Sequence, residues 1–421
     1  MNKLALTTVL ATIAGLSATS AAAQYTKQTA PATTAQPAQP AKPGEAAAQP
    51  QIKISKEASK AIIDLQKSVN ANDVANIPAK VAAAQAVAKT AEDRYAIGQM
   101  QLKAALAVKN DESAAAAVDY IAGSTFLPGA RVAELYNAVG INFYNAKNYD
   151  RAAAMFEKGV AADTRGFESL KLLAEARNSQ GRGAEAAQAM QKALTIAAAS
   201  GQKPAEDVYK RAVSLAYNAK SPLAVDLSRE WVAAYPNAES WTNAIAIYRN
   251  MMRPEIEGTL DLLRLVRAAG ALKSPGDFAV YAQSAANQGN FGEAQSVIDE
   301  GIAAKIIDPS SARFRETVSG LKGKPKASPA DLEASAKIAK TSTAMIAVGN
   351  RFYGIGNYAR SAELYRSALG AGGDAGLANL HLGMALAGAG DKAGATAALS
   401  AVTGEYAGIA KYWLLWVRQA G

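Results

Sequence analysis

The sequence predicts an all-α protein, a solenoid of helical hairpins that stack on one another. Small and large side chains alternate through residues 134–164 in two helix-length blocks, with a turn at residues 145–148. Residues 342–365 repeat the pattern in register: Val348-Gly349, Phe352 and Asn357-Tyr358 correspond to Val139-Gly140, Phe143 and Asn148-Tyr149. One such hairpin cannot cover its own apolar face, so neighbouring hairpins must stack on it.

Composition argues against an enzyme. The chain has no cysteine and a single histidine, His381, so it cannot form a cysteine–zinc site, a thiolate nucleophile or a histidine cluster. We expect His381 to be a surface or groove side chain, and the scattered carboxylates to lie on solvated helix faces. The sequence therefore predicts no catalytic residue, no metal site and no cofactor.

The first 54 residues have two parts. Residues 1–23 resemble a secretory signal peptide, with Lys3, an apolar run and an Ala-rich end that predicts cleavage after Ala23. The apolar run is shorter than the roughly 20 residues that span a bilayer, so we expect no transmembrane segment in the mature form. Residues 24–54 are rich in Pro, Ala and Gln and are predicted to be a disordered linker. These features predict a periplasmic or secreted bacterial protein.

Hairpins are expected along the rest of the chain. Residues 55–132 read as two helical hairpins, either degenerate repeats or an N-terminal cap, and residues 133–302 as successive repeats. The period breaks over residues 303–341, which are predicted to be an irregular basic linker. Its lysines lie among Gly and Pro without interleaved aromatic residues, which favours a solvated loop and no nucleic-acid site. Residues 342–421 are predicted to hold further repeats and a closing helix.

The spacing in residues 134–164 resembles the tetratricopeptide repeat. Tyr136 stands for the aromatic opener of that motif, Val139-Gly140 for its Leu-Gly, Phe143 for its Tyr, and Ala152 and Phe156 for its A-x3-F. Thr164 replaces the closing Pro. The resemblance implies a right-handed superhelical solenoid of such hairpins, whose concave face, lined by each unit's first helix, binds peptides or partner proteins.

The resemblance also points to the residues that face such a partner. In the first strong unit they are Asn137, Ile141, Tyr144 and Asn145, in the next Lys171 and Asn178, and in the third Tyr209 and Tyr217. Amides would pair with a peptide backbone, tyrosines would pack its side chains, and Lys171 would attract a carboxylate. Ile141 stands where the family's carboxylate clamp needs Asn, so the full clamp is absent. The alternative is that these are ordinary solvated positions.

A second candidate surface lies near the C-terminus. Tyr406, Ile409, Trp413 and Trp416 follow helical spacing and form one apolar stripe. The stripe either packs a closing helix onto the last repeat or docks a partner.

Two functions remain open from sequence. The favoured hypothesis is a non-enzymatic periplasmic scaffold that binds a peptide or protein partner, in an envelope, secretion or cell-division assembly. The alternative is an accessory binder of cell-wall or polysaccharide chains, in which aromatic residues stack on sugars and the net charge of +9 meets an anionic polymer.

Overall fold

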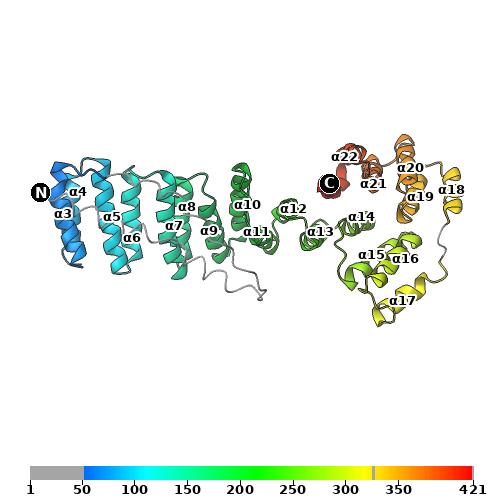
Figure 1. Ribbon diagram of the computed structural model, residues 1–421, viewed down its shortest axis with the longest axis horizontal. Helices are drawn as coiled ribbons and strands as arrows, with labels where there is room; N and C mark the ends of the chain where they lie inside the picture. The colour runs from blue at the N-terminus through cyan, green and yellow to red at the C-terminus, as the bar shows by residue number, and fades with distance from the viewer. Residues whose placement is uncertain (1–51, 325–327, 420–421) are drawn as a thin grey trace. The chain divides into compact units, whose positions relative to one another are not determined.

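The described part of the chain is helical throughout. The computed structural model describes residues 52–324 and 328–419, and within these ranges it holds 21 α-helices, one 3-10 helix and no strand (Figure 1). This confirms the predicted fold class. The predicted signal peptide and all but the end of the predicted linker lie outside the described residues. No described helix is both long and apolar enough to cross a bilayer.

The chain divides into two compact units, residues 1–202 and 203–421, which we call unit 1 and unit 2. The described residues of unit 1 form four consecutive hairpins (Figure 1). Their helices are α3 (Lys56–Asn70), α4 (Ile77–Val87), α5 (Ala91–Ala107), α6 (Asp111–Gly123), α7 (Gly129–Asn145), α8 (Tyr149–Ala162), α9 (Phe167–Ser179) and α10 (Gly183–Ala199). The hairpins predicted within residues 55–132 are α3–α4 and α5–α6.

Unit 2 contains further helices, most of them in hairpins, and ends in a single helix that is not part of a hairpin. Its elements are α11 (Glu206–Asn218), α12 (Leu223–Ala234), α13 (Ala238–Met252), α14 (Ile256–Ala268), α15 (Pro275–Asn287), α16 (Phe291–Ala303), α17 (Ala312–Leu321), α18 (Pro329–Ile338), α19 (Ser342–Gly354), α20 (Tyr358–Gly370), α21 (Ala375–Gly388), α22 (Lys392–Ser400), the 3-10 helix η2 (Gly404–Tyr406) and α23 (Ala407–Gln419).

The two most similar hairpins, α7–α8 and α19–α20, turn in the same way. Asn148 caps α8 by accepting a hydrogen bond from the Arg151 backbone N–H, and Asn357 does the same for α20. Capping satisfies one of the free N–H groups at a helix start. The preceding residue is left-handed in both turns, Lys147 with φ 61° and Gly356 with φ 80°.

Close helix packing explains the spacing of small and large residues that these two hairpins share. A Cβ added to Gly140 would lie 2.5 Å from the Phe156 ring, and one added to Gly349 would lie 2.6 Å from the Tyr365 ring. Both aromatic side chains are buried. Glycine therefore lets the second helix place a large ring directly against the backbone of the first.

Residues 303–341 are more ordered than the sequence predicts, because they contain α17 and α18. Phe314 of α17 and Leu332 of α18 are buried, which anchors each short helix to its neighbours. Ser328 forms a capping box with Asp331 at the start of α18, and Pro329 occupies its first turn. The prediction of an irregular linker is wrong for these two segments.

Candidate functional site

Five of the eight predicted partner-binding residues lie on α7 and α9 with accessible side chains. Asn145 and Asn178 are exposed, whereas Ile141, Tyr144 and Lys171 are half-buried. The Tyr144 hydroxyl lies 2.9 Å from Ser179 Oγ, which joins the ends of these two first helices. We call the surface formed by these five residues the α7–α9 face.

Lys171 is paired on this face. Its Nζ lies 2.9 Å from Glu168 Oε2, and both side chains are partly exposed. Its ammonium also lies 5.8 Å from the centre of the Phe167 ring. A solvent-exposed pair of this kind contributes little net energy, so Lys171 can exchange its partner for a ligand carboxylate at low cost.

Asn137 and Tyr209 are buried, and Tyr209 and Tyr217 belong to unit 2. Asn137 is buried, and a Cβ on Gly159 would lie 2.8 Å from its Oδ1, which places the amide against α8. Tyr209 in unit 2 is 8% exposed, with its ring edge-on to Tyr235 at 5.8 Å. Tyr217 is exposed and accepts a hydrogen bond from Asn250. Tyr209 is therefore a packing residue in this structure.

The C-terminal stripe is also packed. Tyr406, Ile409 and Trp413 are buried within unit 2, and Trp416 is half-buried with its ring 5.6 Å from that of Trp413. The stripe does more than close the last repeat, because α23 contacts α14 as well as α21 and α22. It does not present an open docking patch in this arrangement.

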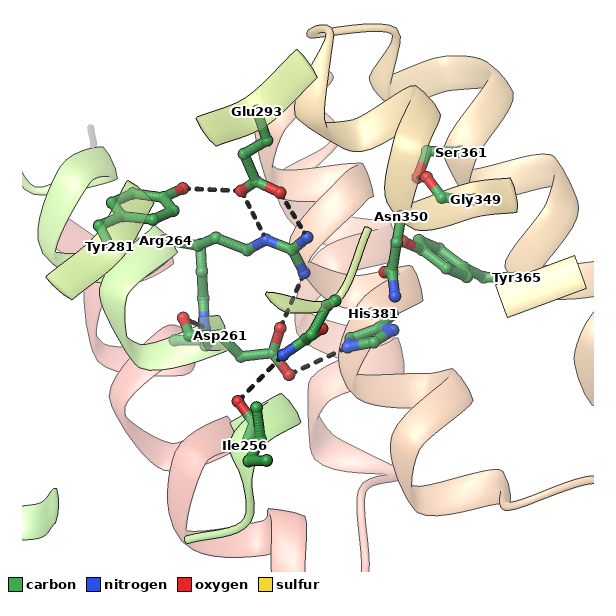
Figure 2. Close-up of polar contacts among 12 residues, drawn as sticks. Ile256, Asp261, Arg264, Tyr281, Glu293, Gly349, Asn350, Ser361, Tyr365 and His381 are labelled. Atoms are coloured by element: carbon green, nitrogen blue, oxygen red, sulfur yellow. Dashed lines mark hydrogen bonds and ion pairs between the residues drawn. The ribbon is translucent and has the colours of Figure 1, made fainter. Parts of the chain in front are cut away.

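The most unusual chemistry of unit 2 is a buried charged network centred on Arg264 (Figure 2). Arg264 donates to both carboxylate oxygens of Glu293 at 2.9 and 2.8 Å, and to Asp261 Oδ1 at 2.9 Å. Asp261 Oδ2 lies 2.9 Å from His381 Nε2, and the Tyr281 hydroxyl donates to Glu293 at 2.8 Å. All five side chains are almost completely buried, so the network lies within the core.

The network perturbs the ionisation of its members. Burial alone would raise the pKa of Asp261, but the neighbouring His381 and Arg264 hold it below its ordinary value. Burial opposes the charge on Arg264, yet Glu293 and Asp261 raise its pKa well above the usual range. Burial and Glu293 together raise the pKa of Tyr281. Asp261 and Arg264 therefore stay charged inside the protein.

A cavity of about 640 Å³ borders this network. Its lining includes Arg264, Arg267, Tyr281, Glu293, Tyr353 and Tyr358. The charged groups there are already paired: Arg267 donates to Glu300 at 2.7 Å, and the Arg264 guanidinium lies 4.8 Å from the Tyr353 ring centre. Paired and stacked side chains of this kind hold α14, α16 and α19 together rather than form an acid–base couple. Among the described residues, no group of three or more His, Asp or Glu is arranged to hold a metal ion.

The sequence-based expectation for His381 and the carboxylates is wrong here. His381 is fully buried, and Asp261 and Glu293 lie in the core rather than on solvated faces. One signal in the sequence could have indicated this. Asp261 and Arg264 stand on a helix whose intervening and flanking residues are leucines, so a solvated face was excluded at those positions.

Comparisons with known proteins agree with the repeat pattern. The tetratricopeptide-repeat family model matches residues 139–203 and 347–408. No curated protein matches the chain significantly.

Similar solved structures share only low sequence identity. The structure of Naa15/Naa10 bound to HypK-THB matches at 12% identity and a TM-score of 0.32, covering 84% of this chain. The chain spans 58% of that relative's length. The TPR2AB domain of yeast Sti1 in complex with a pHSP90 matches at 11% identity and a TM-score of 0.25, over 69% of this chain and 96% of the other.

The TPR domain of P58(IPK) matches at 11% identity and a TM-score of 0.22, over 86% of this chain and 97% of the other. These scores are too low to support a shared site or partner. The repeat assignment depends instead on the two matched stretches, which begin within α7 and α19 and include Gly140, Gly349 and the turns that follow them. Residues 139–203 and 347–408 of the chain are therefore tetratricopeptide repeats.

Proposed function

We propose that this protein is a non-enzymatic scaffold that binds an extended peptide segment of a protein partner on the α7–α9 face. Tetratricopeptide repeats are in general protein-binding modules, which supports the class of function. The finer proposal depends on the side chains of this face.

The observation that carries the proposal is the link between Tyr144 and Ser179. It places α7 and α9 side by side, with an exposed amide at the C-terminal end of each helix, Asn145 and Asn178. A side-chain amide both donates and accepts, which matches the alternating N–H and C=O groups of an extended peptide. Two such amides on neighbouring helices can hold a peptide that crosses both.

The remaining side chains supply packing and charge. Tyr144 is half-buried and its ring meets Tyr149 edge-on at 5.2 Å, so the exposed part of the ring is held in place. Rigid aromatic anchors contribute strongly to interfaces. Lys171 offers a cation to an acidic residue or a C-terminal carboxylate. A polar segment with an acidic group is the partner that suits this face.

The proposed place of action is the periplasm or the exterior of a bacterial cell, in an envelope, secretion or cell-division assembly. The pattern of residues 1–23 supports export. The mature chain should begin at Gln24. N-terminal sequencing of exported protein that still begins at Met1 would contradict this location.

Site-specific photo-crosslinking tests the binding face. A photoreactive residue is placed at Asn145 or at Asn178 in the full chain, and the matched control is Gln188, an exposed amide on the second helix α10. We expect the two positions on the face to crosslink to the same partner peptide in an envelope fraction, and Gln188 to give none of that product. Equal crosslinking from all three positions would place the site elsewhere.

A further inference from the structure

Helix α23 packs back onto helices that lie far from it in the sequence. The Tyr412 hydroxyl lies 3.0 Å from Ser228 Oγ of α12, 184 residues away. The Trp413 indole donates to the Asp261 carbonyl of α14, and Gln419 donates to the Val232 carbonyl of α12. An end helix that only capped the last repeat would contact α21 and α22 alone.

The packing contacts of α23 involve α14 again and a third helix, α13. A Cβ added to Gly258 of α14 would lie 2.7 Å from Ile409 Cδ1, so the glycine makes room for this side chain. The Tyr412 ring lies 5.5 Å from that of Tyr248 on α13, at 80°. These helices therefore form a helix-docking surface, defined by Ser228, Tyr248, Gly258 and the Asp261 carbonyl, which α23 covers.

Several features make the packing of α23 against α12, α13 and α14 less favourable. The Trp413–Asp261 bond and the bond from Tyr412 to the Val225 carbonyl are both 3.3 Å long. Gln419 Oε1 of α23 is buried without a hydrogen-bond partner in the described structure. A buried polar atom without a partner loses its hydration and gains nothing in return. The packing of α23 is therefore less favourable than it would be if every buried polar atom had a close partner.

The connection to α23 can accommodate a movement of the helix. Residues 401–403 and the short helix η2 separate α22 from α23, and Gly404 has a φ of 70°, which few other residues adopt readily. Regular α-helix does not run through this connection. Rotation at a few backbone positions is enough to move a following helix as a rigid body.

We propose that α23 is a detachable latch on this helix-docking surface. Unit 2 exchanges between the closed form and a form in which α23 has left α12, α13 and α14 while the α21–α22 hairpin stays folded. In the closed form the chain withholds the surface from any other amphipathic helix that carries Tyr and Trp at the spacing of α23. The latch is thus a built-in competitor for a helical partner.

The absence of cysteine from the sequence makes a clean test possible. A single thiol is introduced into the full chain as Ile409→Cys, and its rate of labelling by a thiol reagent is measured under native conditions. The matched control is Leu399→Cys, because Leu399 of α22 is equally buried, at 1% exposed, but packs against Gly383 within the α21–α22 hairpin.

The latch predicts that Ile409→Cys labels at least about tenfold faster than Leu399→Cys, since only the former is exposed by local opening. Equal rates would overturn the proposal, because both thiols would then be exposed by the same unfolding of unit 2. The two variants must show the same thermal melt for this comparison.

Hydrogen exchange of the unsubstituted chain tests the same proposal without a mutation. The backbone amides of α23 should exchange faster than those of α21, and all the amides of α23 should exchange at a similar rate. A disulfide between Gly258→Cys and Ile409→Cys should slow the α23 amides to the rate of α21, and reduction should restore the fast exchange. Exchange of α23 and α21 at one rate in the unsubstituted chain would contradict the latch.

Discussion

Arg264 satisfies two buried carboxylates at once. Its guanidinium is bidentate to Glu293 and also donates to Asp261, while Asp261 contacts His381 of α21. A buried ion pair adds little when compared with apolar residues of the same shape, but removal of one partner leaves an uncompensated charge. The network therefore makes unit 2 sensitive to substitution at the arginine.

We expect Arg264→Met to destabilise unit 2 by about 3–5 kcal/mol, because Asp261 and Glu293 would remain buried without their cation. Arg267→Met is the matched control, since Arg267 pairs with Glu300 on a partly exposed surface. The control should cost about 1 kcal/mol or less. Urea unfolding of the two variants measures both values, and equal losses would contradict the importance of burial.

Asp93 gives a pH dependence in unit 1. Burial by itself raises its pKa, but hydrogen bonds from Ser55, Lys89 and Thr90 outweigh burial and lower the pKa from 3.8 to about 2. A lowered folded-state pKa contributes stability that is present above the unfolded value and is lost as the pH falls through the folded value.

Unit 1 should therefore lose stability as the pH falls from about 4 to about 2. Asp93→Asn should lower stability at neutral pH and should weaken this acid dependence. Urea unfolding at a series of pH values measures both effects. An Asp93→Asn variant with the same acid dependence as the parent would show that other carboxyls are responsible.

The sequence predicts the repeats but not this network, for a physical reason. The repeat pattern is local, since Gly140, Phe143 and Phe156 lie within one hairpin. The Asp261–His381 contact joins residues 120 positions apart. Nor does spacing decide burial: Arg131 and Glu134 have the same i,i+3 spacing as Asp261 and Arg264, yet both are exposed. The prediction of the binding site fails at two residues for a similar reason. Helical spacing places Asn137 and Tyr209 on the first helices of their hairpins but does not reveal that each is buried.

At the scale of the helix, the hairpin depends on a glycine that faces a ring. Gly140 and Gly349 hold equivalent positions in α7 and α19, and a Cβ at either would clash with the ring that faces it from the second helix. A helical glycine without such a neighbour has no packing role and only weakens the helix. The two kinds of glycine should respond to alanine in opposite directions.

We expect Gly140→Ala and Gly349→Ala each to cost about 1–3 kcal/mol, through overpacking against Phe156 and Tyr365. Gly123→Ala and Gly370→Ala are the matched controls, because a Cβ at either would meet nothing within 4 Å. The controls should be neutral or stabilising by up to about 1 kcal/mol. Thermal melts of the four variants test this, and a loss in the controls equal to that in Gly140→Ala would refute the packing argument.

At the scale of the whole molecule, the chain forms two compact units, each built of packed helices. The tetratricopeptide-repeat model matches within each of them. Neighbouring repeats stabilise one another, and a few of them suffice for a stable array. Each unit holds at least about three hairpins, which is the number that a stable array needs.

Residues 52–202 expressed alone should therefore fold and melt cooperatively. Circular dichroism of the fragment should show a helical spectrum and one sigmoidal transition. A fragment without a transition would show that unit 1 needs unit 2 to fold.

We propose that the α7–α9 face binds a peptide through its two exposed amides, Asn145 and Asn178. The most direct measurement is the affinity of the crosslinked partner peptide for Asn145→Ala/Asn178→Ala, compared with Gln188→Ala, by calorimetry. Each lost amide hydrogen bond costs about 0.5–1.5 kcal/mol, so the double variant should bind roughly tenfold more weakly while its thermal melt stays unchanged. Gln188→Ala should bind like the parent. Parental affinity in the double variant would contradict the claim and remove the α7–α9 face as the binding site.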